Sequence, residues 1–222
     1  MPSDGTRRPR WWAYALLGWF VGALVGSILL SPWSGRRQVP IEGLALGQVG
    51  LWVGLVGAPI AASRWAGTGS VRRDFGLSVR PGDAVYALVG VAAQVVVVPL
   101  LDLFASRHDI EKPVHKITDP VHGAGFVVLA LVVVVGVPIV EELFFRGLLL
   151  RGIQRDLNVP AAIVLSAVAF GLAHYELVQL PALIVLGLAL GWLAVRTGRL
   201  GPSIWAHAAF NGLAILAVAL QR

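Results

Sequence analysis

The stretch GVPIVEELFFRG, residues 136–147, decides how this chain is interpreted. It places two adjacent carboxylates, Glu141 and Glu142, and the guanidinium of Arg146 inside an apolar run long enough to cross a membrane. An ionised side chain at the centre of a bilayer costs roughly 2.5–3.5 kcal/mol on insertion scales. Such groups are retained where they pair with one another or take part in chemistry, so the stretch predicts a functional site within a membrane.

The composition favours a membrane environment for most of the chain. Of its 222 residues, 57% are hydrophobic and only 14% are charged, whereas a soluble domain carries about 25% charged residues. The net charge of +6 does not indicate nucleic-acid binding, because the basic residues are dispersed at the ends of the apolar runs. The absence of cysteine excludes disulfides, thiolate metal sites and cysteine nucleophiles.

Seven apolar runs predict an all-α, polytopic membrane bundle of about seven transmembrane helices. The runs are about 11–30, 43–63, 84–104, 123–154, 160–175, 177–195 and 200–220. The fourth run is longer than a bilayer requires, so we expect it to tilt or protrude, with a kink at Pro138. Residues 105–122 are predicted to form a polar loop, because Pro113 and Pro120 argue against one continuous helix there.

Histidines at positions 108, 115 and 122 recur every seven residues in this predicted loop. The spacing raises an external metal site as an alternative to a polar loop. We favour the loop, because the two prolines break the helix that would carry the three rings on one face.

Two other predicted helices carry polar residues at the depth of the glutamates. A helix rises about 1.5 Å per residue, which places the polar groups about 10–21 Å from one membrane surface. These groups are Glu141, Glu142, His174, His207 and Asn211. We therefore expect them to meet in one cavity on the cytoplasmic half of the bilayer.

Helical angles separate the roles of the two glutamates. Glu142 and Arg146 are four residues apart, so they share a helix face and are predicted to form a structural ion pair. Glu141 is rotated by about 100° from Glu142 and is expected to face the cavity instead.

This set of side chains suits hydrolysis of an amide by an activated water, without a covalent intermediate. Glu141 would act as general base, and His174 would orient the water. His207 and Asn211 would donate hydrogen bonds to the oxyanion. A divalent metal such as zinc, held by Glu141, His174 and His207, is an alternative that the sequence leaves open.

Three motifs carry a family resemblance: Glu141-Glu142-x-x-x-Arg146, Phe170-x-x-x-His174 and His207-x-x-x-Asn211. Their order and placement resemble the CAAX prenyl endopeptidase and bacteriocin-processing family (the CPBP, or Abi, intramembrane proteases), over roughly residues 126–216. The resemblance implies a membrane endopeptidase with Glu141 as base, His174 beside it, and the second histidine motif completing the site. Its substrate would be a peptide or protein, membrane-bound or not and not necessarily prenylated.

Two functions of other classes are alternatives to a membrane endopeptidase. A non-enzymatic bacteriocin-immunity or regulatory membrane protein could use the same polar cavity for binding. A proton-coupled transporter could use Glu141 as proton carrier, but the sequence lacks the internal repeat and paired broken helices of such proteins.

The sequence predicts a single membrane domain with three parts. Residues 1–10 form a disordered basic tail, residues 11–122 three spans and the polar loop, and residues 123–222 a catalytic core of four spans. Twelve Lys and Arg residues fall on one side of the predicted spans and six on the other. This asymmetry predicts a multi-pass protein of the plasma or inner membrane, with a cytoplasmic N-terminus and an outer C-terminus.

Overall fold

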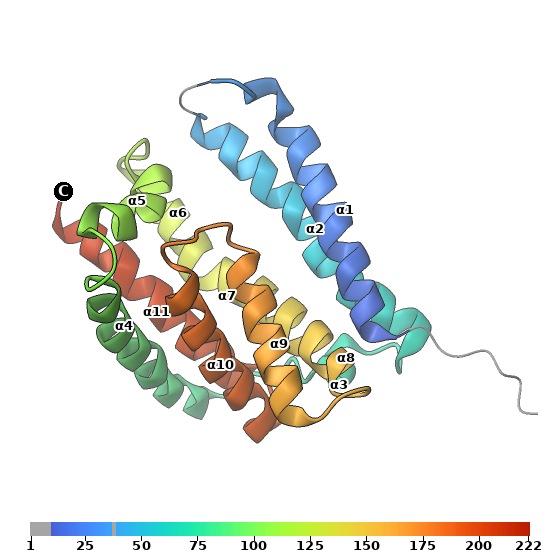
Figure 1. The fold of residues 1–222 in the computed structure, drawn as a ribbon. Coiled ribbons are helices and arrows are strands. Elements are labelled where there is room, and N and C mark those ends of the chain that lie inside the picture. Colours follow the sequence, from blue (N-terminus) through green and yellow to red (C-terminus); the bar gives the residue numbers. More distant parts are fainter. Residues whose placement is uncertain (1–9, 37–38) are drawn as a thin grey trace, which may run out of the picture.

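A computed structural model describes residues 10–36 and 39–222, and every regular element in these ranges is a helix (Figure 1). The predicted all-α membrane bundle is confirmed. Six helical stretches are long and apolar enough to cross a membrane, and Val159–Leu172 is a shorter apolar helix. Together they correspond to the seven predicted spans. The predicted N-terminal tail lies outside the described residues, except for Arg10.

The bounds of the long helices lie close to those of the predicted spans. Their bounds are α1 (Trp11–Leu30), α2 (Ile41–Ala66), α3 (Val71–Phe75), α4 (Ala87–Leu101), α5 (Arg107–Thr118), α6 (Ala124–Leu131), α7 (Val137–Glu141), α8 (Arg151–Ile153), α9 (Val159–Leu172), α10 (Leu180–Thr197) and α11 (Gly201–Leu220). Short 3-10 turns are η1 (Ser31–Trp33) and η2 (Pro81–Tyr86). Two π-helical stretches, η3 (Val132–Gly136) and η4 (Glu142–Leu150), join α6, α7 and α8 into one long span.

The spans alternate in direction, which gives the bundle two distinct ends (Figure 1). At the α5 end, Gln179 Nε2 donates to the carbonyl of Ile110 at 2.6 Å, and C-terminal Arg222 donates to the carbonyl of Val121 at 2.8 Å. At the α3 end, the backbone N–H of Leu200 donates to the carbonyl of Gly76 at 2.9 Å. The chain enters α1 at the α3 end, so its two described termini lie at opposite ends of the bundle.

Residues 105–122 contain a helix, α5, so the prediction of a polar loop there is wrong. The Ser106 side chain caps the helix by accepting from the N–H of Asp109 at 3.2 Å. The helix is amphipathic and buries Ile110 and Thr118 against the bundle. Capping and burial outweigh the one N–H that Pro113 removes from the helical ladder.

Glycines allow α1 and α2 to pack backbone against backbone. A Cβ on Gly54 would collide with the carbonyl of Gly18 and the backbone of Gly22. Close approach through small residues is the usual way in which helices associate in a membrane, because lipid supplies no hydrophobic drive.

We expect Gly54→Ala to lower the free energy of unfolding by about 1–3 kcal/mol, as overpacking does, because the atoms it meets are backbone atoms that cannot rotate away. Gly57→Ala is the matched control, since a Cβ at Gly57 meets nothing within 4 Å. Unfolding in mixed micelles measures both. Equal stability of the two variants would show that the α1–α2 contact does not depend on Gly54.

Candidate active site

Arg146 and Glu142 form a fully buried ion pair at the centre of the bundle. Both side chains are 0% exposed, and Arg146 Nη1 lies 2.9 Å from Glu142 Oε1. The same guanidinium donates to the carbonyl of Gly187 at 3.3 Å. The pairing predicted from the four-residue spacing is confirmed.

The helix around this pair changes its hydrogen-bond pattern on both sides of Pro138. The π-helical stretches η3 and η4 flank the five α-helical residues of α7, which include the proline. Pro138 has no N–H to donate, so the ladder must rearrange near it. Such π-helical turns are frequent at functional sites, because they redirect side chains out of the regular helical repeat.

Glu141 faces away from Arg146 and into a cavity, as predicted. Its Oε2 atom is buried without a hydrogen-bond partner among the described residues. The nearest basic atoms are Nε2 of His207 at 3.8 Å and Nε2 of His174 at 4.0 Å. Three helical spans therefore bring one carboxylate and two imidazoles to one point.

Hydrogen bonds fix which nitrogen of each imidazole carries hydrogen. His174 Nδ1 lies 2.8 Å from the carbonyl of Phe170, and His207 Nδ1 lies 3.0 Å from Glu142 Oε1. Carbonyl and carboxylate oxygens only accept, so both Nδ1 atoms must donate. In the neutral rings both Nε2 lone pairs then face Glu141, and three acceptors converge with no donor between them.

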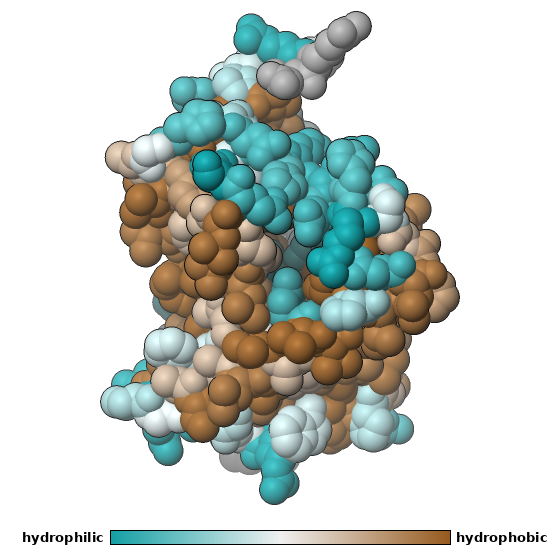
Figure 2. All heavy atoms as spheres, turned by 90° about the vertical axis from the view of Figure 1, so that its left-hand side faces the viewer, coloured by the Kyte–Doolittle hydropathy of each residue, from teal (hydrophilic) through white to brown (hydrophobic). Residues whose placement is uncertain are grey.

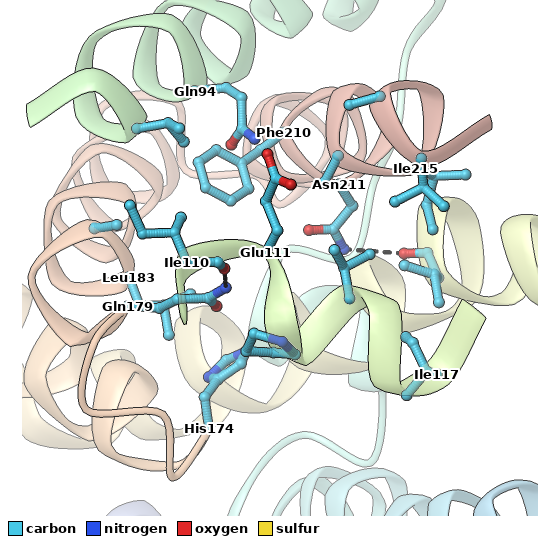
Figure 3. A pocket seen from close by; sticks show the side chains of 18 of the residues that line it. Gln94, Ile110, Glu111, Ile117, His174, Gln179, Leu183, Phe210, Asn211 and Ile215 are labelled. Carbon is cyan, nitrogen blue, oxygen red and sulfur yellow. Dashed lines mark hydrogen bonds between the residues drawn. The ribbon is translucent and has the colours of Figure 1, made fainter. Parts of the chain in front are cut away.

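Asn211 lies on the same face of α11 as His207, one turn further toward the α5 end. Its Nδ2 donates to the carbonyl of Val133 in η3 at 2.9 Å (Figure 3). One of its two amide hydrogens is thus engaged in holding η3, and the residue lines the cavity beside the histidine cluster.

Phe170 is a site residue for which no role of its own was predicted from the sequence. It is fully buried, and the guanidinium carbon of Arg146 lies 4.2 Å above its ring centre. The rings of His174 and His207 contact it edge-on, with centroids 4.8 and 5.5 Å away. The sequence feature that could have identified Phe170 as a site residue is its spacing of four residues from His174, because that spacing places the two rings on one helix face.

The predicted zinc ligands are of the right chemical type, but they lie farther from one another than the ligands of a zinc site do. Two ligands about 2.1 Å from a tetrahedral zinc are roughly 3.4 Å from each other, whereas the separations from Glu141 are 3.8 and 4.0 Å. Within residues 10–36 and 39–222, no group of three His, Cys, Asp or Glu residues is arranged to hold a metal ion. The side chains as placed do not fit zinc, and no reaction step is assigned to a metal.

The cavity has a volume of about 410 Å³ and runs from Glu141 and His207 toward the α5 end. Figure 3 shows α5 lying across it, with Glu111 pointing inward. Figure 2 shows hydrophilic side chains gathered around a hollow on this side of the molecule, above a hydrophobic surface.

This geometry corrects one pair of predictions. The cavity extends toward the end of the bundle opposite to the start of α1. A cytoplasmic N-terminus and a cavity open to the cytoplasm therefore exclude each other. The depth estimate predicted that polar groups of three spans would meet, and Glu141, His174 and His207 do so. It carried no information about the direction from which the cavity is reached. Arg146 must also be removed from the count of Lys and Arg on the two sides of the spans, because it is buried and does not lie at a membrane surface. Eleven basic residues then remain on the side of the N-terminus and six on the other side.

Comparison with known proteins finds a family similarity in the part of the chain that carries the site. The profile of the Rce1-like family, described as type II CAAX prenyl endopeptidase Rce1-like, matches residues 123–213. The match covers less than half of the chain, so it shows a similarity to this family over the four-span part. It begins at the residue where the sequence predicted the four-span core to begin, and it contains all six predicted site residues.

One curated protein is also similar to part of this chain. It is named "Putative membrane peptidase YdiL", from Bacillus subtilis (strain 168), and it is 32% identical over 79 residues. The aligned part covers 36% of this chain and 32% of the relative, so the chain matches about a third of that protein's length. No solved structure matches the chain.

Proposed function

We propose that the chain is a CAAX-protease-like membrane endopeptidase that hydrolyses a peptide bond with a water activated by Glu141. The observation that carries this proposal is the convergence of the Glu141 carboxylate and two imidazole nitrogens on one point of a cavity wall. The Rce1-like match supports the reaction class. The substrate class is a peptide or protein segment, whether or not it carries a prenyl group.

A charge count suggests how the site is protonated. Glu141 and Glu142 contribute two negative charges and Arg146 one positive charge, and a net charge is costly within a bilayer. His207 contacts both carboxylates, through Nδ1 to Glu142 at 3.0 Å and through Nε2 toward Glu141 at 3.8 Å. A proton on His207 balances the cluster, and it leaves two free acceptors, which match the two hydrogens of one water.

In the proposed reaction, that water donates to Glu141 Oε2 and His174 Nε2. Its oxygen attacks the peptide carbonyl carbon while its proton passes to Glu141. The Nε2–H of His207 donates to the oxyanion that forms, and Asn211 supplies a second donor through its free amide hydrogen. The C–N bond then breaks, and Glu141 returns the proton to the leaving nitrogen, giving a carboxylic acid and an amine.

Substrate trapping tests the proposal. Glu141→Gln in the full chain, expressed in cells that lack the wild-type copy, should accumulate uncleaved substrate that co-purifies and is identified by mass spectrometry. The wild-type chain should release two fragments of the same protein. A cellular phenotype that survives Glu141→Gln unchanged would favour the binding or immunity role and overturn the protease proposal.

A chelation experiment addresses the metal. Because the three side chains stand wider than a zinc site, we expect cleavage by the purified chain to survive EDTA and the preparation to contain less than one zinc per chain. Zinc content is measured by mass spectrometry of the digested protein. Loss of activity on chelation, restored by added zinc, would contradict this expectation and place a metal among Glu141, His174 and His207.

The excess of basic residues at the α3 end supports a cytoplasmic location for that end, with the cavity facing the outside of the plasma or inner membrane. The native chain has no cysteine, so single cysteines report accessibility without background. We expect Ser106→Cys, at the α5 end, to react with a membrane-impermeant maleimide in intact cells. Ser70→Cys, at the α3 end, should react only after lysis. The reverse pattern would invert the topology.

A further inference from the structure

The helix α4 carries a single polar side chain, Gln94, in the sequence ALVGVAAQVVVVPLL. The helix lies outside the part of the chain that matches the Rce1-like family, and no role was predicted for it. The Oε1 atom of Gln94 is buried and has no hydrogen-bond partner among the described residues. A buried amide oxygen without a partner destabilises the folded chain. A contribution to stability therefore does not explain why a glutamine occupies this position.

The packing of α4 directs Gln94 into the catalytic cavity. Gly90 brings α4 against α11, because a Cβ there would collide with the carbonyl of Ala206, the residue before His207. Gln94 is four residues later and lies on the same face of α4, so it projects along α11 toward Phe210. Figure 3 shows its amide beside the Phe210 ring, on the opposite side of the view from His174.

The cavity around Gln94 is largely apolar, with Val98, Leu101 and Leu183 among its lining residues. Gln179, a second amide in the wall, is already committed to the carbonyl of Ile110. A peptide that enters such a space loses water from its backbone N–H and C=O groups, and each must find a new partner. A primary amide offers both an acceptor and donors, which match one peptide group.

We propose that Gln94 is a positioning residue that accepts a hydrogen bond from a backbone N–H of the bound substrate, through its unpartnered Oε1. This inference rests on the proposed peptide substrate. Gln94 does not contact the reacting atoms; it holds the chain in the cavity while Glu141 and His174 act on the scissile bond. The N-terminal spans then contribute directly to substrate binding.

The test compares Gln94→Leu with Val95→Leu, a control on the same helix whose side chain is 62% exposed on the outer surface. The probe is a quenched-fluorescent apolar peptide selected from a library. The loss of one buried hydrogen bond should raise KM about tenfold. We expect kcat to stay near that of the control and thermal stability to be equal or higher, because leucine removes a buried oxygen that has no partner among the described residues. A residue with a merely structural role would instead lower stability, which would overturn the assignment.

A backbone scan of the same peptide makes the test specific. Each amide is replaced in turn by an ester, which removes one N–H. At one position, Gln94→Leu should no longer affect KM, because the hydrogen bond is already absent. Effects of the ester and of Gln94→Leu that add at every position would overturn the assignment.

Binding to the Glu141→Gln variant separates this inference from the protease proposal. The Kd of the peptide should rise about tenfold when Gln94→Leu is added. A peptide that binds with this dependence but is not cleaved by the wild-type chain would overturn the protease function and leave the Gln94 inference standing. An unchanged Kd would overturn the inference alone, and a library without any binder would overturn both.

Discussion

Glu141→Gln is expected to lower kcat for peptide cleavage by about 10³-fold, within the range of general-base contributions. The amide has nearly the shape of the carboxylate but cannot take a proton from water. The substitution breaks no hydrogen bond of Glu141 Oε2, because that atom has no partner among the described residues. Thermal unfolding should therefore change little while initial rates in nanodiscs collapse.

The matched control is Glu111→Gln, which removes another carboxylate that lines the same cavity. Glu111 belongs to α5 and is paired with Arg107 and His115 at 4.0 and 3.9 Å rather than with the histidine cluster. The cleavage rate of Glu111→Gln should remain close to that of the wild type. His174→Ala should lose cleavage as Glu141→Gln does, since it removes the second acceptor of the water. Wild-type rates in purified Glu141→Gln would place the base elsewhere.

The membrane fold could be predicted from the sequence because hydropathy and length are sufficient for a spanning helix. The predicted spans at 11–30 and 200–220 match α1 and α11 to within one residue. The helix α5 was missed for a physical reason. Its stability comes from a capping serine and from two residues buried against the bundle, and neither outweighs two prolines when the sequence is considered alone.

Some features of the site could be predicted from the sequence, and others could not. The pairing of Glu142 with Arg146 follows from a four-residue spacing within one helix, and it could be predicted. The approach of His174 and His207 to Glu141 followed from membrane depth together with the motif order. The direction of the cavity could not be predicted, because it depends on where α5 crosses the bundle. The position of Gln94 could not be predicted either, because it depends on the contact between Gly90 and Ala206.

Arg146→Met is expected to lower the free energy of unfolding by about 3–5 kcal/mol, because it leaves the buried Glu142 carboxylate without its cation. Methionine fills much of the space over the Phe170 ring, so the loss reports the charge more than the packing. Unfolding of the purified variant in mixed micelles measures it. Cleavage should fall as well, since Glu142 also orients His207 through Nδ1 at 3.0 Å.

The double variant Glu142→Gln with Arg146→Met separates the expected loss of stability from the expected loss of cleavage. It removes both charges of the pair, and replacing a whole buried ion pair is often neutral or stabilising. Most of the lost stability should return. Cleavage should not return, because a neutral glutamine oxygen accepts from His207 Nδ1 more weakly than a carboxylate does and orients the ring less firmly. If the single variant Arg146→Met were instead as stable as the wild type yet inactive, the guanidinium would act in the chemistry itself. The ion pair would then hold no part of the fold, and the division of labour between the two adjacent glutamates would have to be reversed.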